Sequence, residues 1–353
     1  MNSISFIDNK KVLITGGAGF IGGCLIRRLL KYSKSDVFNL DKLNYASDLE
    51  SINKIENKNS DIKKRYKFFK CDLSNKSKIK NVINKINPDI IIHFAAESHV
   101  DRSINNPSSF IESNILGTYN LLEASLKYWG TLSKLKKQNF KFLHISTDEV
   151  FGSLNSSGKF NEETPYSPNS PYSASKASSD HLVQAWNKTY NFPTLITNCS
   201  NNYGPWQFPE KLIPLTIFKS LIGETIPIYG DGQNIRDWLH VEDHINALLS
   251  VLSKGTIGET YCIGGFGERK NIEVVNSICN YLDKKIPSKN SYSKLIKFIK
   301  DRPGHDLRYS IDSTKINKQL NWIPKITFEE GLISTINWYL ENKHWLKKIK
   351  NMN

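Results

Sequence analysis

Two groups of side chains in this chain have the residue types that proton transfer requires. Thr147, Asp148 and Glu149 follow one another at the end of an apolar, strand-like run, and Tyr172 and Lys176 come soon after them. A tyrosine and a lysine four residues apart on a helix share one face, and the lysine charge favours the phenolate over the neutral phenol, whose ordinary pKa is about 10. We expect Tyr172 to accept a hydroxyl proton while hydride leaves the same carbon for a nicotinamide, and Thr147 to orient the substrate oxygen.

The two adjacent carboxyl groups exceed what hydride transfer alone requires. We predict that Asp148 and Glu149 have unlike roles, one a protonated acid and the other an ionised base, with surroundings that push their pKa values apart. Once C4 of a sugar is a ketone, its C5 proton becomes acidic, and a carboxylate can remove it while an acid protonates the departing C6 hydroxyl. The alternative is that one carboxylate caps the next turn and the other is solvated. We favour sugar oxidation followed by loss of water.

A glycine-rich segment predicts a dinucleotide site near the N-terminus. The strand-like run 11–15 leads into Gly16, Gly17, Gly19 and Gly22, which let the backbone turn tightly and approach a pyrophosphate at the start of a helix. Asp41 ends the next strand, about 20 residues further on, where a carboxylate binds an adenosine ribose and repels a 2′-phosphate. The segment therefore favours NAD over NADP.

Asp72 has two open interpretations. It follows the third strand-like run, where an acid can reach the adenine edge, and it is followed by Leu73. It could equally cap the helix that we expect near residue 75, and the two roles are compatible.

Short apolar runs alternate with longer helical stretches over the first 200 residues. This alternation predicts an α/β fold, a Rossmann-like doubly wound parallel sheet with a smaller C-terminal substrate-binding lobe. The expected strands are 11–15, 36–40, 66–70, 89–94, 140–146 and 194–198, and the expected helices are 20–32, 75–86, 107–130 and 171–190.

Beyond residue 200, prolines and glycines indicate a loop-rich segment, and residues 237–263 resemble a return to the sheet. We therefore assign 1–202 and 237–264 to an NAD-binding domain, and 203–236 and 265–353 to a nucleotide-sugar-binding lobe.

Composition narrows the class of protein. The chain has 353 residues, 39% of them hydrophobic, and a formal net charge of +14. Its lysines are dispersed without a nucleic-acid-binding motif, so we interpret the charge as a solvated surface whose field attracts a diphosphate. No apolar run approaches a membrane span and no secretory signal precedes the first strand, so we expect a cytoplasmic protein. Five scattered cysteines fit reduced thiols. His240 and His244 lack a further ligand, so we expect no metal.

The motifs together resemble the dTDP-glucose 4,6-dehydratase family, nucleotide-sugar dehydratases of the extended short-chain dehydrogenase/reductase superfamily. The resemblance runs nearly end to end. Its most specific parts are His99-Val-Asp-Arg-Ser103 and Asp301-Arg-Pro-Gly-His-Asp306, beside Thr147-Asp-Glu149 and Tyr172-Ser-Ala-Ser-Lys176. Phe94 replaces a usual leucine, and Cys262 replaces a common asparagine.

The resemblance implies three steps on one sugar. Tyr172 takes the C4 hydroxyl proton as hydride passes to NAD. Glu149 then removes the C5 proton while Asp148 protonates the C6 oxygen, and hydride finally returns to C6. The product is a 4-keto-6-deoxy nucleotide sugar, which places the protein in deoxysugar biosynthesis, with dTDP-rhamnose as an expected later product.

The resemblance also implies which residues bind each ligand. Those for NAD are Gly16, Gly19, Phe20, Ile21, Gly22, Asp41, Lys42, Leu43, Asn44, Asp72, Leu73, Phe94, Ala95, Ala96, Ser98, Ser113, Tyr172, Lys176 and Asn202. Those for the sugar are Ser98, Thr147 and Asn201, and those for the diphosphate are Lys211, Arg236 and Arg302, with His305 close by. Those for the nucleoside are Leu212, Pro227, Tyr229 and Asn271.

A homodimer formed through the helices 107–130 and 171–190 is implied by the resemblance alone. The rival interpretations are another nucleotide-sugar enzyme (a UDP-sugar 4,6-dehydratase, 4-epimerase or decarboxylase), a non-catalytic NAD-binding sensor and a nucleic-acid-binding protein. An epimerase would not need Asp148 and Glu149.

Overall fold

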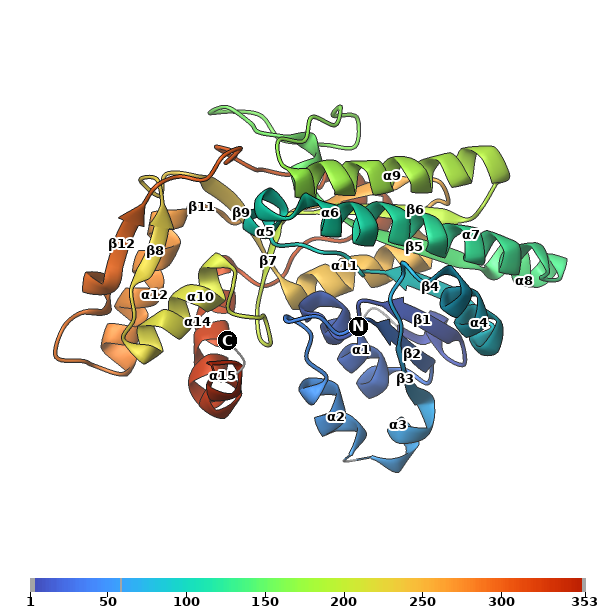
Figure 1. Cartoon of the computed structure of the whole chain (residues 1–353), viewed down its shortest axis with the longest axis horizontal. Coiled ribbons are helices and arrows are strands. Elements are labelled where there is room, and N and C mark those ends of the chain that lie inside the picture. Colours follow the sequence, from blue (N-terminus) through green and yellow to red (C-terminus); the bar gives the residue numbers. More distant parts are fainter. Residues whose placement is uncertain (1–3, 58, 351–353) are drawn as a thin grey trace.

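A seven-stranded parallel sheet forms the centre of the larger lobe in the computed structural model, which describes residues 4–57 and 59–350 (Figure 1). The strand order is β10-β6-β5-β4-β1-β2-β3, and every neighbouring pair is parallel. The strands are β1 Lys11–Thr15, β2 Asp36–Asp41, β3 Tyr66–Lys70, β4 Ile90–His93, β5 Lys141–Thr147, β6 Thr194–Cys199 and β10 Thr260–Ile263. The predicted α/β architecture is confirmed.

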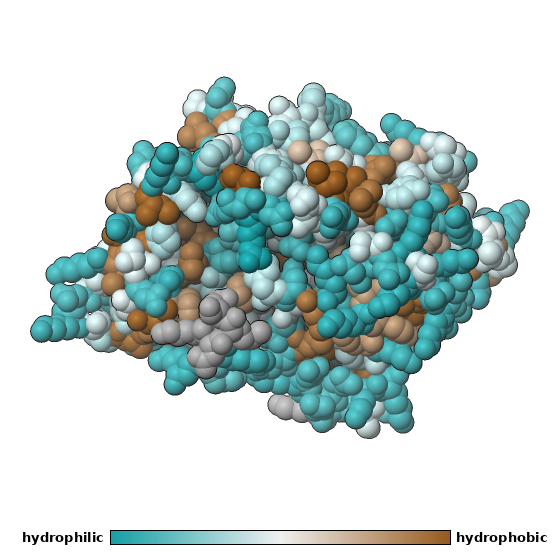
Figure 2. Space-filling model, in the orientation of Figure 1, coloured by the Kyte–Doolittle hydropathy of each residue, from teal (hydrophilic) through white to brown (hydrophobic). Residues whose placement is uncertain are grey.

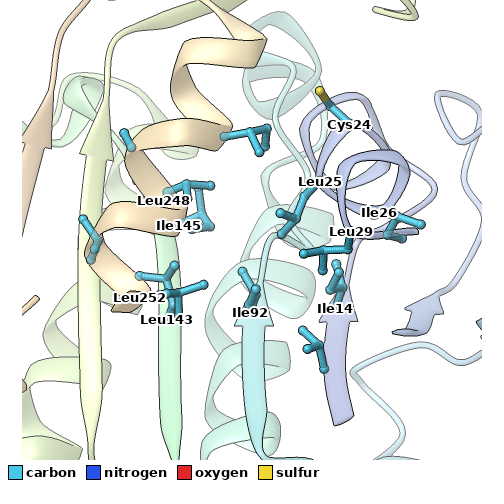
Figure 3. Packing of buried hydrophobic residues seen from close by; sticks show 14 of the residues in the cluster. Ile14, Cys24, Leu25, Ile26, Leu29, Ile92, Leu143, Ile145, Leu248 and Leu252 are labelled. Carbon is cyan, nitrogen blue, oxygen red and sulfur yellow. The ribbon is translucent and has the colours of Figure 1, made fainter. Parts of the chain in front are cut away.

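Successive residues of the central strands pack on opposite faces of this sheet. In β4, Ile90 and Ile92 join one buried cluster and Ile91 joins another. This alternation follows from the two-residue period of a strand and explains the unbroken runs of β-branched residues, since both faces are covered. The helices α1 (Phe20–Tyr32) and α11 (Val241–Lys254) cover one face of the sheet. Their Leu29 and Leu248 pack over the strand residues in Figure 3.

The opposite face is covered by α4 (Lys76–Ile86), α7 (Gly117–Gly130) and α9 (Pro171–Tyr190). The long helix predicted at 107–130 is divided: α6 (Pro107–Phe110) leads into a π-helical turn, η2 (Ile111–Leu116), before α7. Such turns are rare and are frequent at functional sites. In α9 the capping box between Ser170 and Ser173, with Pro171 at the first helical position, fixes the predicted start.

The smaller lobe lies on the left of Figure 1. It holds a three-stranded sheet of β7 (Asn201–Tyr203), β9 (Ile235–His240) and β11 (Glu268–Lys270), and a parallel pair of β8 (Ile226–Tyr229) and β12 (Ile296–Ile299). Its helices are α10 Leu212–Ile222, α12 Asn271–Lys285, α14 Phe328–Glu341 and α15 Lys343–Lys350.

Two details of this lobe depart from the pattern of the sequence. The segment expected to be loop-rich contains α10, where Pro214 is tolerated because it lies in the first turn, whose N–H groups have no helical acceptor. Of the predicted return to the sheet, β10 joins the central sheet, whereas β9 pairs with β7 and β11. The domain boundaries stay a prediction.

Short elements complete the chain. They are η1 Ile4–Ile7, α2 Glu50–Glu56, α3 Ser60–Arg65, α5 Val100–Asn105, α8 Lys134–Asn139, η3 Asp148–Phe151, η4 Tyr292–Leu295 and α13 Thr314–Leu320. All five cysteines are buried free thiols. Within the described ranges, none of the helices has the length and apolarity to cross a membrane. The face in Figure 2 is mostly hydrophilic, with separate apolar patches.

Candidate active site

A cavity of about 640 Å³ gathers most of the predicted residues. It is bounded by the carboxyl ends of β1, β2, β4, β5 and β6 and by segments of the smaller lobe. Open α/β sheets bind their ligands at this edge. The predicted residues that line the cavity are Gly16, Gly19, Phe20, Ile21, Gly22, Asp41, Lys42, Asn44, Asp72, Leu73, Phe94, Ala95, Ala96, Ser98, Ser113, Thr147, Asp148, Glu149, Tyr172, Lys176, Asn201, Asn202, Lys211, Leu212, Pro227, Tyr229, Arg236, Asn271, Arg302 and His305.

The glycine loop turns tightly and packs closely against neighbouring backbone. Gly16 has a φ of +72°, and a Cβ built there would lie 2.6 Å from the Ala95 backbone nitrogen. A Cβ on Gly22 would lie 2.5 Å from the Gly16 carbonyl oxygen. Only glycine fits both positions, and the free N–H groups at the start of α1 point to a pyrophosphate ligand. The loop therefore fits a dinucleotide.

Asp41 braces this loop. Its Oδ2 accepts a hydrogen bond from Ala18 N at 3.0 Å, and its Oδ1 accepts one from Leu43 N at 2.8 Å. Burial raises the pKa of Asp41, and these two amide donors oppose the shift. Leu43 is absent from the cavity lining and is 37% exposed, so only its backbone amide supports the site.

The capping interpretation of Asp72 is wrong. The N-cap of α4 is Asn75, whose side chain accepts a hydrogen bond from Lys78 N at 3.0 Å. Asp72 Oδ1 instead accepts one from Ser74 N at 2.8 Å, and Asp72 lines the cavity. The adenine-edge role stays a prediction.

Asp148 and Glu149 begin η3, immediately after β5. The Thr147 hydroxyl accepts a hydrogen bond from Glu149 N at 3.3 Å and caps this turn, so neither carboxylate is its cap. Asp148 is 1% exposed, and its Oδ2 has no hydrogen-bond partner among the described residues. Burial, followed by the charges of Glu149 and Asp237, raises the pKa of Asp148 well above its usual value.

Glu149 lies among more cations than Asp148 does. Burial raises the pKa of Glu149 above its usual value, and the charges of Lys211, Arg302 and Arg236 oppose this rise. For Asp148, the charge of Arg236 opposes the rise. The two carboxyl groups thus have the unlike surroundings that an acid and a base require, with Asp148 suited to hold a proton and Glu149 to give one up.

Tyr172 and Lys176 share a face of α9, as their spacing predicts, and both line the cavity. Burial and the charge of Glu149 raise the pKa of Tyr172 well above its usual value, and a hydrogen bond with Thr147 opposes the shift. The predicted effect of the Lys176 charge on the phenol stays a prediction. Lys176 Nζ donates to the Ile145 carbonyl at 2.8 Å and lies 3.4 Å from His144 Nε2.

The cations predicted to bind a diphosphate converge on the cavity. Lys211 Nζ donates to the Ser98 carbonyl oxygen at 2.6 Å, and Arg302 Nη1 pairs with Asp101 Oδ1 at 3.0 Å. Arg236 Nη2 donates to the Asp306 carbonyl at 2.9 Å. These side chains are fixed by protein acceptors and can offer their remaining donors to an anion.

The predicted nucleoside end has an apolar and aromatic lining. Tyr229 OH donates to Asp101 Oδ2 at 2.8 Å, and the Tyr229 and His305 rings meet edge to face with centroids 6.0 Å apart. His305 Nδ1 lies 2.6 Å from Asp301 Oδ1. Leu212 and Pro227 complete this end of the cavity.

Several residues that line the cavity were not predicted. Tyr45 OH donates to Glu210 Oε2 at 2.7 Å, which joins the segment after β2 to the smaller lobe, and the Arg102 guanidinium lies 3.5 Å from the Tyr45 ring centroid. In the sequence, Tyr45 follows the predicted residue Asn44 and Glu210 precedes the predicted residue Lys211. These neighbours were a signal from which both cavity residues could have been predicted. Tyr309, which donates to Asp306 Oδ2, had no such signal.

Among the described residues, no group of three or more His, Cys, Asp or Glu side chains could hold a metal ion. His240 Nδ1 accepts a hydrogen bond from Glu242 N at 3.3 Å, and His244 Nδ1 lies 2.9 Å from Asn202 Oδ1. Both histidines have local hydrogen-bonding roles.

Comparison with known proteins gives close and nearly full-length matches. The model of the family described as GDP-mannose 4,6 dehydratase matches residues 13–335. A dTDP-glucose 4,6-dehydratase of Escherichia coli is 53% identical over 352 residues, which cover 96% of each chain. Two solved structures also align over 96% of this chain and 99% of their own. They are a Streptomyces venezuelae dTDP-glucose 4,6-dehydratase double mutant with NAD bound (39% identity, TM-score 0.85) and the Bacillus anthracis dTDP-glucose 4,6-dehydratase in complex with NAD (42% identity, TM-score 0.82).

Proposed function

We propose, from the premise that this chain belongs to the GDP-mannose 4,6 dehydratase family, that it is an NAD-dependent dTDP-glucose 4,6-dehydratase. It converts dTDP-glucose to dTDP-4-keto-6-deoxy-glucose and is a hydro-lyase. The observation that carries the proposal is the pair of unlike carboxyl groups, Asp148 and Glu149, in the same cavity as Tyr172.

NAD is the cofactor, and when bound it would supply the acceptor and later the donor of a hydride. The glycine loop with Gly16 and Gly22 would hold its pyrophosphate, because a Cβ at either position would collide with the backbone. Asp41 would bind the adenosine ribose, and its charge would disfavour a 2′-phosphate. Lys176 would contribute positive charge beside the reacting groups.

Tyr172 acts as the base of the oxidation step. Its phenol accepts the proton of the C4 hydroxyl, and Thr147 orients that oxygen through its own hydroxyl. Because burial raises the pKa of Tyr172, positive charge near the phenol is needed to favour proton loss, and both Lys176 and the oxidised nicotinamide carry such charge.

Water loss then depends on the carboxyl pair. Glu149, beside three cations, removes the C5 proton that the C4 ketone has made acidic. Asp148, whose pKa burial raises, donates its proton to the C6 oxygen, and the C5–C6 bond becomes double as water leaves. Return of hydride to C6 and of a proton to C5 completes the cycle without net use of cofactor.

Substrate recognition is divided along the cavity. Lys211, Arg236 and Arg302 would bind the diphosphate, with His305 nearby, by charge-assisted hydrogen bonds. Ser98 and Asn201 would contact the sugar. The nucleoside end would contact Leu212, Pro227, Tyr229 and Asn271.

One experiment separates this function from its rivals. Purified protein is incubated with dTDP-glucose or UDP-glucose, and the masses of the products are measured by mass spectrometry. A dTDP-glucose 4,6-dehydratase removes one water from dTDP-glucose and prefers it to UDP-glucose. A 4-epimerase leaves the mass unchanged, a UDP-sugar 4,6-dehydratase prefers UDP-glucose, and a non-catalytic sensor binds NAD without turnover.

Finer features of the proposal rest on family resemblance. We place the enzyme in the cytoplasm, acting on free nucleotide sugar in deoxysugar biosynthesis that leads to dTDP-rhamnose. We also propose a homodimer through α7, α9 and η2, a surface where Ile111 and Leu116 are exposed and where α7 and α9 run side by side in Figure 1. Sedimentation of the purified protein at twice the mass of one chain would support it.

A further inference from the structure

A third ionisable residue continues the Tyr172 and Lys176 face of α9. Asp180 follows Lys176 by four residues, as Lys176 follows Tyr172, so the three side chains lie along one side of the helix. Asp180 is 0% exposed and is absent from the cavity lining. A buried carboxylate is costly unless it is paired and hydrogen-bonded, so its partners indicate its role.

One oxygen of the Asp180 carboxylate accepts three hydrogen bonds. Its Oδ2 accepts hydrogen bonds from Ser146 Oγ at 2.8 Å, Tyr166 OH at 3.0 Å and Asn198 Nδ2 at 3.1 Å. Its Oδ1 lies 3.1 Å from His144 Nε2. Although burial opposes it, His144, Lys176 and Ser146 hold the pKa of Asp180 below its usual value, so the group is ionised.

The His144 ring lies close to both this carboxylate and Lys176. The same Nε2 atom lies 3.4 Å from Lys176 Nζ, and Lys176 is only 4% exposed. Burial lowers the pKa of His144 to about 4, so the ring is neutral near pH 7. The chain thus places a neutral imidazole between a buried ammonium and a buried carboxylate.

Four other titratable groups near Lys176 (Cys199, Tyr172, His93 and Tyr166) supply no competing negative charge. Burial raises the pKa of the Cys199 thiol on β6 and that of Tyr172 on α9, so both stay neutral. On β4, His93 has its ring centroid 5.1 Å from that of His144, and burial lowers the pKa of His93 well below its usual value. Burial and the Asp180 charge raise the pKa of Tyr166. Among the charges that act on Lys176, that of Asp180 raises its pKa most.

We propose that Asp180 is a positioning residue of this enzyme, whose buried carboxylate is the counter-ion of Lys176 and keeps that ammonium group charged and in place on the face of α9 that also carries Tyr172. The inference rests on the proposed function for its catalytic consequence. Its physical content, a charge coupling between Asp180 and Lys176, is independent of the substrate.

The same carboxylate also fixes the end of β5. Asn198 Nδ2, which donates to Asp180, also donates to the Thr147 carbonyl at 3.1 Å, and Ser146 is the residue before Thr147. A purely structural role would act through these hydrogen bonds alone. The experiment must therefore separate charge from hydrogen bonding.

The test is the titration of Lys176 in the NAD-bound protein by NMR of ¹³C-labelled lysine, with the signal assigned by its loss in Lys176→Met. Burial lowers the pKa of Lys176 and the Asp180 charge raises it. Asp180→Asn keeps the shape and removes the charge, so the midpoint should fall by about one pH unit or more, the usual effect of losing a nearby opposite charge. The alkaline limb of the oxidation rate should move by the same amount.

Two controls make the outcome decisive. Tyr166→Phe removes one hydrogen bond to Asp180 but leaves its charge, and Asp180→Glu preserves the charge, so both should keep the Lys176 midpoint near that of the parent. Equal midpoints in Asp180→Asn and Tyr166→Phe would overturn the proposal. A protein inactive on dTDP-glucose but with a shifted midpoint would contradict the proposed function and leave the coupling standing.

A measurement on the unmodified protein covers the case in which Asp180→Asn does not fold. In ¹³C-labelled aspartate spectra, the Asp180 carboxyl should have the chemical shift of a carboxylate at pH 7. A protonated Asp180 at that pH would overturn the proposal, because a neutral group is no counter-ion.

Discussion

The Glu149 carboxylate raises the pKa of its buried neighbour Asp148, while Lys211 and Arg302 act on Glu149 itself. Adjacent carboxyl groups repel one another, so one holds a proton when the other is ionised. In this cavity Lys211, Arg302 and Arg236 oppose the rise in the pKa of Glu149, whereas Arg236 opposes that of Asp148. That asymmetry is the basis of the predictions for the elimination step.

Glu149→Gln should separate oxidation from water loss. The glutamine keeps the side-chain volume but cannot accept the C5 proton, whereas Tyr172 is unchanged, so enzyme-bound NADH should accumulate without dehydrated product. Stopped-flow absorbance of NADH with mass analysis of the sugar checks this. Glu163→Gln, at an exposed position, is the matched control and should retain both steps. Equal loss of both steps in Glu149→Gln would refute the division of labour.

Asp148→Asn should remove the acid and change the pH dependence. Because the folded-state pKa of Asp148 is raised, the folded protein keeps this proton over a pH range in which the unfolded chain has lost it. Stability therefore falls as pH rises through that range, and the variant should lack this fall. Its melting temperature relative to the parent should increase with pH, and water loss should slow. A constant difference across pH 4 to 8 would argue against a protonated Asp148.

Tyr172→Phe should slow the oxidation step by roughly 10²–10⁴, the usual contribution of a positioned acid–base group. Single-turnover formation of NADH from dTDP-glucose measures it. Tyr190→Phe lies on the same helix at an exposed position and should react normally. A Tyr172→Phe variant as fast as this control would remove Tyr172 from the mechanism.

Gly16→Ala should weaken NAD binding by roughly tenfold to a hundredfold, the equivalent of about 1–3 kcal/mol of backbone strain. Its positive φ and the nearby Ala95 backbone leave no room for a methyl group. Gly130→Ala, where a Cβ would meet nothing within 4 Å, should leave binding unchanged. Cofactor retained after gel filtration, released and quantified, provides the comparison. Full NAD content in Gly16→Ala would move the site away from this loop.

Arg302→Met should raise KM for dTDP-glucose by roughly 10- to 100-fold, since a hydrogen bond to a charged group contributes about 1.5–3 kcal/mol. Arg269→Met, in an exposed ion pair with Glu329, should have little effect. Steady-state kinetics of both variants test this, and an unchanged KM in Arg302→Met would place the diphosphate elsewhere.

The central fold was predictable because its signals are local. Unbroken β-branched runs such as the one in β4 and the glycine loop before α1 each specify their own structure. The small sheet of β7, β9 and β11 was not predicted, because its strands are short and pair across long stretches of chain. The π-helical turn at 111–116 also has no signal in its spacing.

Most residues of the site could be predicted from the sequence, but their contacts and the directions of their side chains could not. Spacing placed Tyr172 and Lys176 on one face, but burial and the Ile145 carbonyl decide where the lysine points. The contact of Tyr45 with Glu210 depends on how two distant segments approach. Charges acting through space set the unlike character of Asp148 and Glu149.

The most direct test of the account follows one hydride through the cavity. Purified protein is given dTDP-glucose deuterated at C4, and the product is analysed by mass spectrometry and NMR. Oxidation, elimination and return at one site predict a product that has lost one water and carries the deuterium at C6. A product of unchanged mass, or one whose deuterium has exchanged with solvent, would contradict the account.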